Sequence, residues 1–120
     1  MPHIVFDKKI NLLGFKDKFI PIFQNESSLI RVSTIFVDKD NLTALLPTVS
    51  ISKLHQQYLI EISTRKSKTT IRLYPTTDPK KTDEVKESMV LVAKQILNNY
   101  PESKIIQTNI PQTKSIVMVP

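Results

Sequence analysis

Residues 28–37, SLIRVSTIFV, and residues 42–51, LTALLPTVSI, decide the fold of this chain. Both stretches are rich in β-branched and apolar side chains, and the four residues between them, DKDN, are typical of a turn. The pattern therefore predicts a β-hairpin with a four-residue connection. Pro47 cannot donate a ladder hydrogen bond, so it predicts that the second strand lies at a sheet edge or ends there.

Strict alternation would divide the first strand of this hairpin into two faces. The even-numbered residues from Ile30 to Phe36 fall on one face. The odd-numbered residues from Leu29 to Val37 fall on the other.

Shorter apolar stretches predict further strands around the hairpin. They are expected near 18–24, at 3–6 and at 69–74. The tail 103–119 predicts one more strand or a segment that binds across a partner. The chain has one glycine, so turns are expected to use Asn, Asp, Ser and Pro.

Residues 53–64, KLHQQYLIEIST, fit two structures. A strand explains the alternating residues Tyr58, Ile60 and Ile62. A helix explains apolar residues spaced by three, four and four: Ile51, Leu54, Tyr58 and Ile62. Because Ser52 is suited to cap a helix, we favour the helix and keep the strand as the alternative.

The segment from Pro79 to Tyr100 predicts a long amphipathic helix. Its apolar residues recur on one side: Val85, Met89, Val92, Ile96 and Tyr100. Asp78 is suited to cap this helix, with Pro79 at the first helical position, and Pro101 ends it.

Composition predicts one globular domain over residues 1–120, with 1–17 and 103–120 as peripheral extensions. We predict an α+β fold, an antiparallel β-sheet or sandwich with the long C-terminal helix and a second helix at 53–64. The longest apolar run, Met89 to Ala93, is far too short to span a bilayer. No secretory signal is recognisable, so cytoplasm or nucleus is expected.

The same composition argues against an enzyme. Phosphate-binding loops need several glycines, and this chain has only Gly14. With no cysteine and only His3 and His55, a zinc site is not expected. We predict no catalytic residues, no cofactor and no metal.

One basic band carries most of the net charge of +6. Residues 63–81 hold six cations against the single Asp78: Arg65, Lys66, Lys68, Arg72, Lys80 and Lys81. The band is compatible with a protein partner that has an acidic surface, or with cations at the C-terminus of a helix. The alternative is a small nucleic-acid-binding module that uses residues 65–81.

Three pieces of the C-terminal half carry a resemblance to a known family: HQQYLIEISTRKSK, TTIRLYPTTD and VKESMVLVAKQILNNYPESK. A hairpin, a basic segment, a short strand and a long helix closed by Tyr100-Pro101-Glu102 follow one another. This order resembles the small proteasome assembly chaperones of eukaryotes, most closely the fourth type, over roughly residues 18–104.

The resemblance implies an α+β domain without an active site, which pairs with a second chaperone of the same fold. The pair would escort α-subunits of the 20S proteasome during ring assembly. The apolar residues Leu29, Ile35 and Val37 suit a dimer surface of this kind. We predict that these residues and the basic Arg65, Lys66, Lys68 and Arg72 bind a partner.

Overall fold

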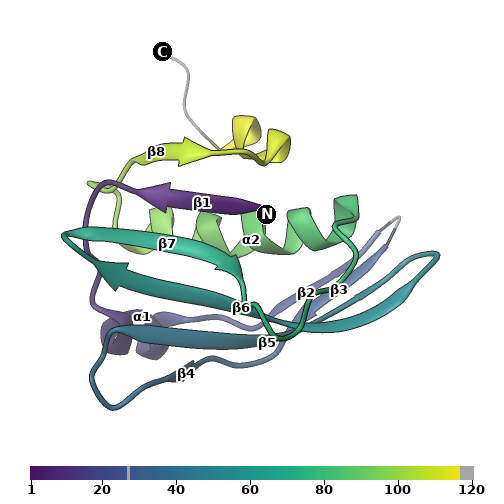
Figure 1. Ribbon diagram of the computed structural model, residues 1–120, viewed down its shortest axis with the longest axis horizontal. Coiled ribbons are helices and arrows are strands. Elements are labelled where there is room, and N and C mark those ends of the chain that lie inside the picture. The colour runs from purple at the N-terminus through teal and green to yellow at the C-terminus, as the bar shows by residue number, and fades with distance from the viewer. Residues whose placement is uncertain (27, 117–120) are drawn as a thin grey trace.

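The computed structural model describes residues 1–26 and 28–116 and confirms an α+β fold (Figure 1). Within this part of the chain, eight strands form one antiparallel sheet in the order β2-β3-β5-β6-β7-β1-β8, and β4 also pairs with β5. The strands are β1 His3–Phe6, β2 Ile22–Asn25, β3 Leu29–Val32, β4 Phe36–Val37, β5 Thr43–Ile51, β6 His55–Arg65, β7 Lys68–Leu73 and β8 Ile105–Thr108. The helices are α1 Leu12–Lys18, α2 Asp83–Asn99 and the short 3-10 helix η1 Pro111–Ser115.

The sheet has an inner face, covered by helices, and an outer face. It curls around α2, which contacts β3, β5 and β7, while α1 and η1 pack beside α2 (Figure 1). Every second residue of the central strands points inward into the core, such as Leu46, Ile60 and Ile71. Among the described elements, no helix covers the outer face.

Helix α2 confirms the predicted amphipathic pattern. Val85, Met89, Val92 and Ile96 are fully buried against the sheet. The cap differs from expectation, because the side chain of Thr82 accepts the Val85 N–H at 3.3 Å. Asp78 instead forms an ion pair with Lys81, ahead of the helix.

The predicted hairpin is present, but its first strand is interrupted. Val32 pairs with Thr48 and Phe36 pairs with Leu45. Three residues, 33–35, therefore lie opposite two, 46–47, as in a β-bulge. This extra residue reverses the alternation beyond it, so Ile35 and Val37 point inward and Phe36 points outward. The predicted division of faces is therefore wrong after Val32.

Pro47 does not end its strand or place it at an edge. Strand β5 runs through Pro47 to Ile51 and lies between β3 and β6. The interruption between β3 and β4 lies opposite Pro47, where the ladder lacks a donor. The missing hydrogen bond of Pro47 therefore coincides with an interruption in the neighbouring strand, and β5 itself continues.

The helix favoured for 53–64 is wrong, because His55–Arg65 is the longest strand of the sheet. It pairs with β5 from Thr43 to Ile51 and with β7 along its second half. Tyr58, Ile60 and Ile62 point inward, as the strand alternative required. Pairing with β5 and β7 satisfies the backbone and buries the inward side chains of the segment, so tertiary pairing overrides the helix expected over 53–64 and its cap at Ser52.

The second helix of the fold is α1, in the segment expected to be peripheral. Asn11 caps it by accepting the Gly14 N–H at 3.3 Å. Residues 1–17 are central rather than peripheral, because β1 lies between β7 and β8 and supplies the fully buried Ile4 and Phe6. The strand expected at 18–24 begins only at Ile22, since α1 runs to Lys18.

Strands β1 and β7 confirm the predictions at 3–6 and 69–74, with β7 starting one residue earlier. In the tail, β8 confirms one added strand, and Ile116 packs against the core. The remaining apolar residues, Val117–Val119, lie outside the described residues. The tail is therefore part of the fold as far as residue 116.

Turns without glycine are made as the composition suggested, with one addition. Asn41 and Ser67 adopt positive φ angles of 60° and 65°, and Lys66 adopts 50°. Lys66 and Ser67 form the two-residue β6–β7 turn, where positive φ at both positions matches the twist of the strands.

Candidate functional site

The outer face of β5 carries an apolar stripe, which we define as Leu45, Pro47, Val49 and Ile51. These residues alternate with the buried residues of the same strand and remain half-buried or exposed. The buried inner row of the same strand mixes apolar Ala44 and Leu46 with Thr48 and Ser50. No described helix covers the outer row. The solvated face of an antiparallel sheet is normally polar, so an apolar row there is typical of a surface that another element covers.

Two phenylalanines flank the stripe. Phe23 on β2 pairs with Arg31, which in turn pairs with Val49 of the stripe, and Phe23 is 65% exposed. Phe36 on β4 pairs directly with Leu45 and is 62% exposed. Large aromatic side chains left in solvent beside an apolar strand are typical of protein-binding surfaces.

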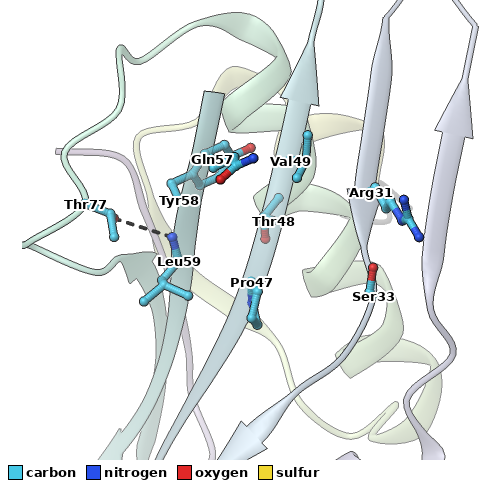
Figure 2. A pocket seen from close by; sticks show the side chains of 9 residues that line it. All are labelled: Arg31, Ser33, Pro47, Thr48, Val49, Gln57, Tyr58, Leu59 and Thr77. Atoms are coloured by element: carbon cyan, nitrogen blue, oxygen red, sulfur yellow. Dashed lines mark hydrogen bonds between the residues drawn. The ribbon is translucent and has the colours of Figure 1, made fainter. Parts of the chain in front are cut away.

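A shallow open depression lies across the outer face beside the stripe (Figure 2). Pro47 and Val49 from β5 and Leu59 from β6 form its apolar side. Arg31 on β3 and Ser33, just after β3, lie on the other side. The N–H of Leu59 donates to the Thr77 hydroxyl at 3.5 Å, which holds the following loop at the rim. The depression is a concave, mostly apolar surface with one exposed guanidinium at its margin.

One ion pair lies in the row that begins at Phe36. Leu45 lies opposite Glu61, and Glu61 lies opposite Arg72. The Arg72 guanidinium donates from Nε to the Glu61 carboxylate, which is only 7% exposed although it lies on the outer face. Arg72 is therefore engaged within the sheet rather than free for a partner.

The seven predicted partner-binding residues are not brought together. Leu29 lies on the outer face, half-buried beside Ile51. Ile35 is only 4% exposed in the core, and Val37 packs against the core, so neither is available on the surface. Sequence reasoning missed Phe23 and Phe36 as surface residues, and the apolar residues at alternate positions 45, 47, 49 and 51 are the signal that could have indicated the stripe.

The basic band separates into two groups in space. Arg65, Lys66 and Lys68 are exposed at the β6–β7 turn. Lys80 lies near the opposite end of β6, where its N–H donates to the Gln56 side chain at 2.7 Å. Gln56 and Arg65 are nine residues apart on one strand, which corresponds to roughly 30 Å.

A polar cluster lies on the inner face beneath the first turns of α2. The Tyr58 hydroxyl donates to the Ser88 hydroxyl at 2.7 Å, and Ser88 donates to the Val85 carbonyl at 2.6 Å. Burial raises the pKa of Tyr58 above its usual value near 10. The cluster is enclosed between sheet and helix, so its role is structural.

Nothing among the described residues assembles a reactive or metal-binding centre. No group of three or more His, Asp or Glu residues is placed to hold a metal ion in that part of the chain. His3 Nδ1 lies 3.0 Å from the Met1 carbonyl oxygen, and His55 is exposed at the start of β6. None of the helices placed by the structure is both long and apolar enough to cross a membrane.

No family model, no curated protein and no solved structure matches this chain.

Proposed function

We propose that this chain is a non-catalytic protein-binding module that acts as an assembly chaperone. In this proposal it pairs with a partner of the same fold through the outer face of its sheet, and the pair binds 20S proteasome α-subunits during ring assembly. The apolar stripe on β5, uncovered and flanked by Phe23 and Phe36, is the observation that carries the proposal.

An apolar row on the outer face of an antiparallel sheet is normally buried by another element. The helices bury the inner face, and a second sheet of the same kind would bury the outer face at the usual sheet-to-sheet distance of about 10 Å. Exposed aromatic side chains supply large contact areas at low conformational cost. The α+β architecture is also the one that the resemblance to proteasome assembly chaperones implies.

The nucleic-acid alternative receives less support. The cations of residues 65–81 are divided between opposite ends of β6, and Arg72 is paired with Glu61. Single-stranded nucleic acid is usually bound by stacking on aromatic side chains next to cations. The two exposed phenylalanines instead flank the apolar stripe on the outer face.

The proposal is tested by tagging the full chain in its source cell, recovering it, and identifying co-purified proteins by mass spectrometry. We expect proteasome α-subunits and one small protein of similar size. A matched variant, Val49→Glu, should lose both, because a carboxylate would be buried in the stripe. Recovery of the same proteins with Val49→Glu, or recovery of nuclease-sensitive complexes by the wild type, would contradict it.

A further inference from the structure

A second surface lies at the end of the sheet where β1 ends and β7 begins. Six exposed cations from three separate segments meet there, and we call them the basic end: Lys8, Lys9, Arg65, Lys66, Lys68 and Lys104. They come from the loop after β1, the β6–β7 turn and the residue before β8. Figure 1 shows these three segments together at the left of the molecule.

Hydrogen bonds to Thr69 and Asp7 hold these segments together. Phe6 pairs with Thr69, whose hydroxyl donates to the Lys8 carbonyl at 2.8 Å and accepts the Ile10 N–H at 3.1 Å. The Asp7 N–H donates to the Lys104 carbonyl at 2.9 Å. The Lys104 N–H in turn donates to the Asp7 carboxylate at 2.8 Å. The backbone beneath the cations is therefore fixed before any ligand binds.

None of the six cations of the basic end forms an ion pair among the described residues, and the Asp7 carboxylate is the one acidic group hydrogen-bonded into the cluster. The two ion pairs of the described residues lie outside the basic end and join Arg72 to Glu61 and Lys81 to Asp78. On the neighbouring β4–β5 turn, the Asp38 carboxylate accepts the Leu42 and Thr43 N–H groups at 2.9 and 3.2 Å. An excess of positive charge thus faces solvent at one end of the sheet.

The composition of the basic end favours an acidic polypeptide over single-stranded nucleic acid. Five of its six cations are lysines, whose flexible ammonium groups can each meet a separate carboxylate. No aromatic side chain belongs to the cluster, so it offers no stacking platform for bases.

We propose that the basic end binds an acidic, extended polypeptide segment, rich in Asp and Glu, on a protein partner. Such a segment can place successive carboxylates against cations that come from three turns. This surface is separate from the apolar stripe, and the proposal does not depend on which partner covers the outer face.

The test is a titration of the full chain with a fluorescent oligoglutamate peptide at low salt. The variant is Lys9→Glu/Lys68→Glu/Lys104→Glu. The matched control is Lys53→Glu/Lys80→Glu/Lys114→Glu, which changes three exposed lysines away from the basic end by the same net charge. We expect roughly a tenfold or greater loss of affinity in the variant and less than about a twofold loss in the control.

Several outcomes would overturn the proposal. Equal losses in the two triple variants would mean that only net charge matters. Tighter binding to an oligothymidylate of matched charge would assign the surface to nucleic acid. Tighter binding to phosphatidylcholine vesicles containing phosphatidylserine would assign it to a membrane.

Folding is controlled by comparing the thermal midpoints of all proteins. If the triple variant does not fold, single Lys→Gln substitutions at the same three positions replace it. The summed loss of peptide affinity should then exceed the summed loss for Lys→Gln at the control positions Lys53, Lys80 and Lys114. Equal sums would reject the proposal.

Discussion

The two faces of β5 differ chiefly in what covers them: the buried inner row joins Ala44 and Leu46 to Thr48 and Ser50, and the uncovered outer row is apolar from Leu45 to Ile51. The inward residues Ala44 and Leu46 are sealed under helices, whereas the outward residues Leu45 and Val49 meet solvent with a similar apolar character. Burial of each large apolar side chain contributes about 1.5–3 kcal/mol to folding. The apolar side chains on the outer face are not buried in this way, so they remain available for association with a partner. One strand therefore contributes stability through its inner face and, in our proposal, binding through its outer face.

The largest expected effect tests the inner face. Met89→Ala and Ile60→Ala should each lower the free energy of unfolding by about 2–5 kcal/mol, because each leaves a cavity in a fully buried core. Leu59→Ala, one residue away but on the outer face, is the matched control and should cost much less. Urea unfolding followed by circular dichroism measures all three. Equal losses of unfolding free energy for Ile60→Ala and Leu59→Ala would show that the outer face is buried as fully as the inner face.

The next effect tests the outer face. Phe36→Ser combined with Val49→Ser should weaken binding to the partner by about 2 kcal/mol or more, typical of hot-spot residues. The free energy of unfolding should change little in comparison with Met89→Ala. Calorimetric titration with the purified partner and urea unfolding provide the two measurements. A large loss of stability with unchanged affinity would show that these side chains belong to the fold alone.

A smaller effect concerns the helix that covers the inner face. Thr82→Ala should cost about 1 kcal/mol, because it removes the hydroxyl that accepts the Val85 N–H. Asp78→Ala is the control, since Asp78 precedes the helix and forms an exposed pair with Lys81. Chemical denaturation of both variants would locate the cap. A larger loss for Asp78→Ala would return the cap to the position that the sequence suggested.

The smallest effect concerns the polar cluster under α2 and depends on pH. Burial raises the pKa of Tyr58, so the folded state holds its proton more tightly than the unfolded state does. This contribution is fully present below the usual pKa near 10 and is lost as the pH rises through the higher pKa of the folded state.

Tyr58→Phe should therefore cost about 1 kcal/mol near neutral pH, through the lost hydrogen bond to Ser88. Above the usual pKa of tyrosine, the variant should lose less stability with pH than the wild type. Burial also raises the pKa of Tyr100, but this residue is only half-buried, so Tyr100→Phe is the comparison in which the same change with pH should be smaller. Thermal unfolding as a function of pH provides the measurement, and parallel curves for wild type and Tyr58→Phe would contradict the assignment.

Sequence alone determined the features that depend on local pattern. The period of α2 placed Val85, Met89, Val92 and Ile96 on one buried face because a helix repeats every 3.6 residues regardless of what it packs against. The hairpin around residues 38–41 followed from turn chemistry between two β-rich stretches.

The tertiary structure decided everything that depends on pairing between distant segments. Residues 53–64 had two competing periods, and only neighbours on both sides made them a strand. One extra residue opposite Pro47 reversed the alternation and moved Ile35 from the expected surface into the core.

The candidate binding surfaces were decided in the same way. Lys8, Lys9 and Lys104 joined the β6–β7 turn only through the pairing of β1 with β7 and β8, while Lys80 moved to the opposite end of β6. The sequence shows which charges are neighbours along the chain. Strand register and strand order decide which charges from distant segments share a surface. Sequence could therefore indicate a basic band and apolar strands, and only the folded sheet showed where each is exposed.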